Sequence, residues 1–125
     1  MINKHAISAT FLALVLSWTN SSQAQTVEGV IQGAGCHINA QTCVTSKLDP
    51  HLILESDFVL VTDDNYFFLP NLPRHEKIQL LDTKVRIVGD VGQHQIDVST
   101  VSKYQGHQFY TVWDWEQIQF DLYEG

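Results

Sequence analysis

The sequence is short of basic residues, and this shortage excludes two classes of partner. Its 125 residues include seven Lys and Arg against fourteen Asp and Glu. Binding to nucleic-acid phosphates needs a positive surface, and docking on anionic lipid needs a polybasic segment. We therefore expect no nucleic acid among the partners and no electrostatic attachment to a membrane surface.

The motifs of the common catalytic sites are also missing. There is no Gly-x-Ser-x-Gly, no Walker loop, no His-Glu-x-x-His and no dinucleotide fingerprint. The acidic residues are expected to be mostly solvated surface. We therefore predict a protein that is not an enzyme, with no catalytic residue and no cofactor.

Long hydrophobic runs are absent except near the N-terminus. Lys4 precedes a mostly apolar stretch at 6–18, and Ser22-Gln23-Ala24 fits the small-x-small rule of signal peptidase. This order is typical of a cleaved secretory signal, because a membrane-spanning helix needs about 20 apolar residues. We expect residues 1–24 to be removed. Residues 25–125 should then form one domain, periplasmic or secreted, without stable membrane insertion. With six basic and fourteen acidic groups, its net charge would be −8.

Most of the remaining sequence has the pattern of β-strands. The order predicted is a strand, a long loop at 32–48, two strands, a short helix and two strands, with a β-bulge near Ser99-Thr100 where the apolar alternation slips by one residue. Pro73 suits the first turn of the helix. The five strands and the helix are expected at Val27–Gln32, Phe58–Val61, Tyr66–Leu69, Lys84–Val91, Ile96–Val101 and Arg74–Leu81.

Three further segments are less regular. Leu52–Glu55 is expected as a strand or the entry to one. Gln108–Trp115 is another strand candidate, and Ile118–Leu122 fits either an extra strand or an amphipathic tail.

Five strands with the helix between the third and fourth is the order of the OB-fold, a small Greek-key barrel. The runs at 29–36, 57–60, 66–74, 85–89 and 96–98 resemble small exported bacterial proteins with an OB-like barrel. The resemblance covers most of 27–101 and implies the fold and the periplasmic location. It assigns no functional residue, because its motifs are structural. The expected fold class is therefore all-β with a small α contribution: an OB-like five-stranded Greek-key barrel with a C-terminal extension.

The two cysteines, Cys36 and Cys43, are expected to form a disulfide that closes a short loop. A redox-active pair is not expected, because the Cys-x-x-Cys spacing and its βαβ setting are both absent. The chain-entropy estimate for so short a loop is roughly 2.5 kcal/mol.

Two histidines near these cysteines suggest an alternative. His37 follows Cys36, and His51 lies eight residues after Cys43, so two thiolates and two imidazoles could bind zinc or copper. The ligands are not in tight pairs, and an oxidising compartment would compete for the thiols. A metal site at His37 and His51 is therefore the weaker reading.

Aromatic residues are abundant on or beside the predicted strands, and a small barrel can bury only some of them. Trp113 and Trp115 should share one face if Gln108–Trp115 is a strand. Together with Tyr66 and Phe68 they form the candidate binding face, with core packing as the alternative. The predicted function is that of a non-catalytic envelope protein, a binding or accessory module for a protein, peptide or small ligand. The alternative is a periplasmic metal-binding protein that uses His37, His51, Cys36 and Cys43.

Overall fold

The computed structural model describes residues 23–39 and 42–124. Residues 1–22, which hold nearly all of the predicted signal peptide, lie outside the described residues. The strands are β1 (Gln25–Gly33), β2 (Phe58–Val61), β3 (Tyr66–Phe68), β4 (Lys84–Val91), β5 (Ile96–Gln105) and β6 (Gln108–Asp114). The helices are α1 (Gly35–Asn39), the 3₁₀ helix η1 (Pro50–Leu54), α2 (Arg74–Gln79) and α3 (Trp115–Glu124).

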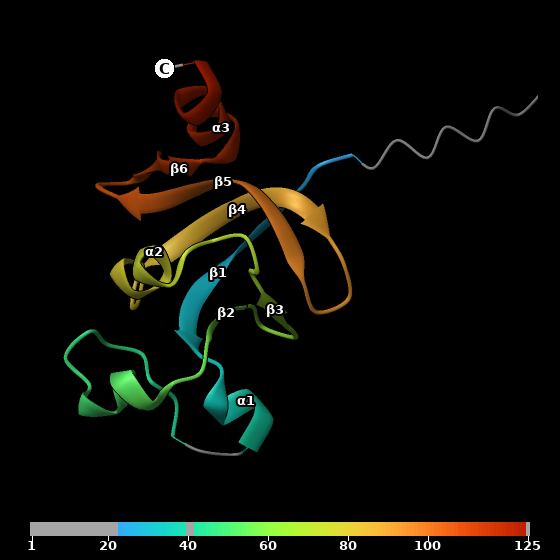
Figure 1. Ribbon diagram of the computed structural model, residues 1–125. Helices are drawn as coiled ribbons and strands as arrows, with labels where there is room; N and C mark the ends of the chain where they lie inside the picture. The colour runs from blue at the N-terminus through green and yellow to red at the C-terminus, as the bar shows by residue number, and fades with distance from the viewer. Residues whose placement is uncertain (1–22, 40–41, 125) are drawn as a thin grey trace, which may run out of the picture.

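The strands form one six-stranded sheet in the order β3-β2-β1-β4-β5-β6, and neighbours are antiparallel (Figure 1). β3 and β6 are its two edges. Phe68 makes an isolated parallel bridge to Gln95, and its N–H donates to the carbonyl of His94 at 2.8 Å. This contact brings the β3 edge to the start of β5.

The fold is mostly β with few helices, so the all-β class is confirmed. The closed barrel of five strands is not what the chain forms, because β6 extends the sheet beyond β5. Gly106 and His107 both have positive φ, 60° and 72°. Two such residues make the tight turn that suits a two-residue hairpin. Gln105 then pairs with Gln108, and the chain folds back along β5.

The predicted bulge is confirmed in β5. Val98 and Thr100 pair with successive residues of β4, so Ser99 is the extra residue. Gly89 on β4 lies where an added Cβ would collide with the backbone carbonyl of Asp97. The bulge keeps Val98 and Val101 on the buried side despite the slip in alternation.

The core lies between the sheet and the segments that connect its strands. β2 is buried on both faces, as its continuous apolar run predicts, and Phe58, Val59 and Leu60 are all fully buried. The main cluster consists of Ile31, Val44, Phe58, Leu60, Phe67, Leu69, Leu72, Leu80, Leu81, Val85, Ile87, Ile96, Val98, Val101 and Trp113.

Two local predictions are wrong. Residues 50–54 form η1 and not a strand, because the Asp49 side chain accepts a hydrogen bond from the His51 N–H at 2.8 Å and Pro50 occupies the first turn. Within the predicted loop at 32–48, residues Gly35–Asn39 form the short helix α1. α1 and η1 lie at one end of the molecule, and α3 lies at the other (Figure 1).

Candidate functional site

The predicted disulfide between Cys36 and Cys43 is confirmed, with an S–S distance of 2.09 Å. Cys36 lies in α1, and Cys43 precedes the buried Val44. The Val44 carbonyl accepts a hydrogen bond from the Gly33 N–H at 2.8 Å. Both cysteines are therefore anchored beside the end of β1.

A buried carboxylate supports the same turn. Glu55 is 8% exposed, and its Oε2 accepts a hydrogen bond from the Gly35 N–H at 3.0 Å. The Ala34 N–H donates to the Asp57 carbonyl at 2.9 Å. These bonds satisfy N–H groups at the start of α1 that the short helix cannot satisfy itself.

The ring of Tyr66 joins residues that the sequence placed in two different candidate sites. It stacks on His37, with centroids 5.4 Å apart, and on His94 at 4.8 Å. Phe68 meets the same ring edge-on at 6.1 Å. β3 alternation buries Phe67 and turns Tyr66 and Phe68 to the other side, where α1 places His37.

The metal-ligand candidates are only partly brought together. Cys36, His37 and Cys43 place their potential ligand atoms within 4.8 Å of one another, and they are the one such group among the described residues. His51 is not a member. Its Nδ1 lies 2.9 Å from Asp49 Oδ1, at a largely exposed position in η1.

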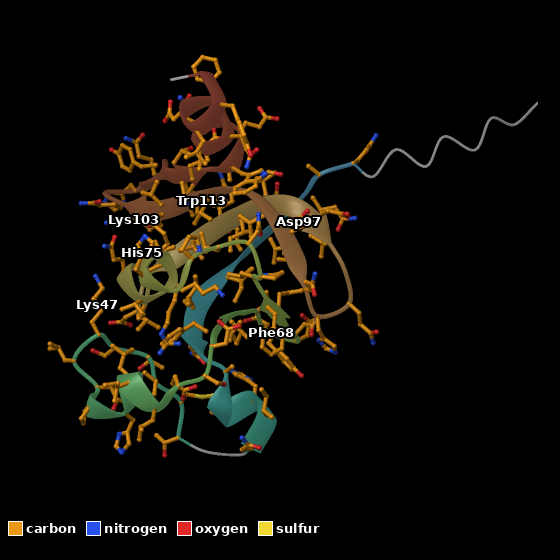
Figure 2. The ribbon with its side chains drawn as sticks, viewed as in Figure 1. Lys47, Phe68, His75, Asp97, Lys103 and Trp113 are labelled. Carbon is orange, nitrogen blue, oxygen red and sulfur yellow. A yellow bond between two sulfur atoms is a disulfide. The ribbon has the colours of Figure 1, made fainter. Side chains whose placement is uncertain are left out.

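The four residues of the predicted binding face do not form one face. Tyr66 and Phe68 lie on the edge strand β3, and Trp113 lies on the opposite edge strand β6. Figure 2 shows Phe68 and Trp113 well apart on the molecule. The Phe68 side of the sheet and the Trp113 side must therefore be considered as separate surfaces.

The side chains of Trp113 and Trp115 are in contact, but the two residues do not lie on one face of a single strand. A register shift in β6 pairs Trp113 with Val101, and Trp115 is already the first residue of α3. The two indoles stack at 6.0 Å. Trp113 is 7% exposed and belongs to the core, while Trp115 is 40% exposed and covers it from outside.

The sequence contains a helix N-cap pattern at the start of α3, in Asp114 and Gln117. Asp114 Oδ1 accepts hydrogen bonds from the N–H groups of Glu116 at 3.0 Å and Gln117 at 3.3 Å. An Asp followed three residues later by Gln is a typical helix N-terminus. Residues 118–122 belong to the helix α3, so they do not form the extra strand that was one of the two expectations for this segment. The capping pattern at Asp114 indicates a helix there.

A surface that the sequence did not single out lies beyond Trp115. It combines exposed large apolar side chains of the β5–β6 hairpin and α3, each between 40% and 80% exposed. We call it the C-terminal apolar surface: Tyr110, Val112, Trp115, Phe120, Leu122 and Tyr123. Tyr104 is also exposed, but it pairs with Phe109 and so points to the opposite face of the hairpin from Tyr110. Beside it, Val112, Trp113 and Ile118 line a shallow hollow of about 410 Å³, with Glu76 of α2 and Asp114 also in its lining.

Among the residues that the structure describes, the carboxylates of Asp49 and Glu28 have clearly shifted pKa values. The His51 backbone N–H, helped by its side chain, lowers the pKa of Asp49. The hydrogen bond from Arg86 lowers the pKa of Glu28, and the loss of solvent around the carboxylate opposes this shift without reversing it. The Arg86 guanidinium also lies 4.0 Å from the centroid of the Phe109 ring, on the face of the β5–β6 hairpin that carries Tyr104.

No protein-family model, curated protein or solved structure matches this chain. The resemblance to small exported OB-like proteins therefore stays a prediction. In the part of the chain that the structure describes, no helix is long and apolar enough to cross a membrane.

Proposed function

We propose that this protein is a non-catalytic binding module of the bacterial envelope, exported through residues 1–24. Its partner would be a polypeptide segment that carries large apolar side chains flanked by Lys or Arg. The observation that carries the proposal is the C-terminal apolar surface, where six large apolar side chains are exposed and one of them, Val112, lines a shallow hollow. A monomer seldom leaves so many of them together without a use.

The chemistry of the surface favours a polypeptide partner. Four of its six members are Tyr, Trp or Phe, and aromatic side chains are enriched where protein interfaces are strongest. Among the described residues β6 pairs with β5 alone. Its outer edge therefore has backbone groups free to pair with an added strand.

The charge of the module favours a basic partner. The predicted mature chain has six basic and fourteen acidic groups, and Glu76 and Asp114 line the hollow itself. Acidic groups around an apolar centre attract Lys and Arg at the rim, which speeds association and selects against acidic partners.

A second exposed apolar region could also be a binding surface. Leu48, Ile53 and Leu54 are 93%, 84% and 78% exposed near the disulfide. They are aliphatic, and they lie on η1 and the loop before it, whereas the C-terminal residues are mostly aromatic and lie on a hairpin and a helix.

This contrast supplies a matched control. A photo-crosslinking amino acid at Phe120 should capture a partner in intact cells, and the same amino acid at Ile53 should not. Leu122→Asp should abolish the Phe120 crosslink and leave the melting temperature nearly unchanged, because Leu122 is 70% exposed. Ile53→Asp should leave the crosslink intact.

The captured species should be a polypeptide, and added salt should weaken its binding. Crosslinks at Ile53 instead of Phe120 would refute the surface assignment. A crosslinked dimer of the protein itself, with a matching mass in light scattering, would replace the basic partner with a second copy. An intact mass that begins at Met1 in the soluble envelope fraction would refute export by a cleaved signal.

A further inference from the structure

The disulfide end of the molecule contains a cluster of soft ligand atoms that the proposed binding function does not use. The sulfurs of Cys36 and Cys43 and one ring nitrogen of His37 all lie within 4.8 Å of one another. Ligand atoms that share one cation lie about 3.5–4 Å apart, given metal–ligand bonds of about 2.0–2.3 Å. Small side-chain movements would therefore suffice once the sulfurs are no longer bonded to each other.

The imidazole of His37 has unused bonding capacity. Its Nε2 is buried and has no hydrogen-bond partner among the described residues. A buried polar atom without a partner costs free energy and calls for a specific explanation. Meanwhile the stacked ring of Tyr66, at 5.4 Å, fixes the orientation of the imidazole.

The backbone around the cluster is held by bonds that do not depend on the disulfide. The Gly33 N–H donates to the Val44 carbonyl, and the His37 N–H donates to the Ala34 carbonyl. The Gly35 N–H donates to the buried Glu55 carboxylate. None of these bonds involves a cysteine sulfur, so we expect them to hold the two sulfurs near His37 after the disulfide opens.

We propose that reduction of the Cys36–Cys43 disulfide converts this cluster into a site for one soft d¹⁰ cation, Cu(I) or Zn(II). A dithiol reductant supplies two electrons and two protons, the S–S bond breaks, two thiols form, and the reductant is oxidised to its own disulfide. Cation binding then forms two Sγ–metal bonds and releases the two thiol protons, while the neutral His37 imidazole donates its lone pair.

The donor set decides the class of metal. Two thiolates and one imidazole favour soft or borderline cations over Mg²⁺ or Ca²⁺, which take oxygen ligands. Three protein ligands suit a three-coordinate Cu(I), or a Zn(II) with water in its fourth position. The ligand set keeps Cys36, Cys43 and His37 from the one the sequence suggested and differs from it only in leaving out His51.

The experiment uses the purified protein, oxidised or reduced under anaerobic conditions, with Co(II) as a probe for Zn(II). Only the reduced protein should show thiolate-to-cobalt charge-transfer absorption, at one equivalent of metal. Competition with chromophoric chelators for Zn(II) and, separately, for Cu(I) then gives the two affinities and shows which cation binds more tightly.

The variants are chosen to test each ligand. The Cys36→Ser/Cys43→Ser double variant should bind neither cation. His37→Gln should lower the affinity by at least roughly tenfold, the lower end of what even outer-shell ligand partners contribute. His51→Ala is the matched control and should bind like the wild type.

A measurement on the wild-type protein tests the role of His37 even if one of the variants does not fold. In ¹⁵N spectra the ring nitrogens of His37 should shift on metal addition to the reduced protein, and those of His51 should not. The proposal is overturned if the reduced wild type binds neither cation, if the oxidised protein binds as tightly, or if His37→Gln has no effect. Leu122→Asp should leave metal binding unchanged, so failure here and failure of the proposed binding function are separate results.

Discussion

The two ends of the molecule keep their structure by different means. At one end, α1 and η1 are short helices, and the Cys36–Cys43 disulfide ties α1 to the segment that precedes η1. At the other end, β6 and α3 contain no cysteine, and they are held by Trp113 in the core and by Ile118, which is partly buried against it (Figure 1).

This difference separates residues that fold the protein from residues that can bind. At the disulfide end, short helices expose aliphatic side chains because the cross-link and the Glu55 carboxylate hold the backbone. At the C-terminal end, Trp113 and Ile118 anchor the unit. Phe120, Leu122 and Tyr123 are 59%, 70% and 80% exposed, so we expect folding to depend on them less than on this anchor.

The largest expected effect tests the anchor of the C-terminal end. Trp113→Ala should lower the free energy of unfolding by about 3–5 kcal/mol, because it empties a buried aromatic site. Trp115→Ala should cost clearly less, because its ring is 40% exposed. Urea denaturation of both variants measures the difference, and equal losses would contradict the division between core and surface.

The next effect tests the covalent link. Cys36→Ser/Cys43→Ser should lower the free energy of unfolding by on the order of 2–3 kcal/mol, because the unfolded chain regains the entropy of the open loop. The sheet should survive, since the strands lie outside the loop. Far-ultraviolet circular dichroism and thermal unfolding check both parts, and loss of the sheet would show that the link organises more than its own end.

A smaller effect tests how α3 begins. Asp114→Ala removes the acceptor for two N–H groups of the first helical turn and should cost about 1 kcal/mol. The loss should appear as faster amide exchange in 115–118 before any change in β1 or β2. Asp121→Ala in the same helix is the control: its carboxylate accepts a hydrogen bond from the Gln117 side chain at 2.9 Å and not from a backbone N–H of the first turn, so exchange should change little.

The smallest effect is a pH dependence at the disulfide end. The pKa of Asp49 is lowered in the folded protein, so the carboxylate favours folding above its unfolded pKa. This contribution is lost as the pH falls through the folded pKa. In an NMR titration His51→Ala should raise the pKa of Asp49 only in part, because the backbone N–H of residue 51 still donates. A full return to the ordinary value would assign the shift to the imidazole instead.

Much of the strand pattern could be predicted from local residues. The continuous apolar run at β2, the alternation in β4 and the slip that marks Ser99 depend on which side of the backbone each side chain takes. The pairing of Cys36 with Cys43 followed because the chain has only two cysteines. The N-terminus of α3 was also encoded locally, in Asp114 and Gln117, although the strand pattern of 108–115 obscured it.

Other features of the structure depend on contacts between segments that are far apart in the sequence. Alternation could not tell that a register shift would bury Trp113, or that β3 and β6 would be opposite edges. Nothing near Asn71 in the sequence indicates that its side-chain amide bonds to both the N–H and the carbonyl of Val98, at 2.8 and 2.7 Å.

The same holds for Tyr66, whose ring meets His37 of α1 and His94 of the turn between β4 and β5. The sequence by itself determined the strands, the disulfide and the acidic charge, because these depend on residue type and near neighbours. The tertiary structure decided which aromatic residues are core, which are surface and which histidine faces the sulfurs, because these depend on the order in which strands pair.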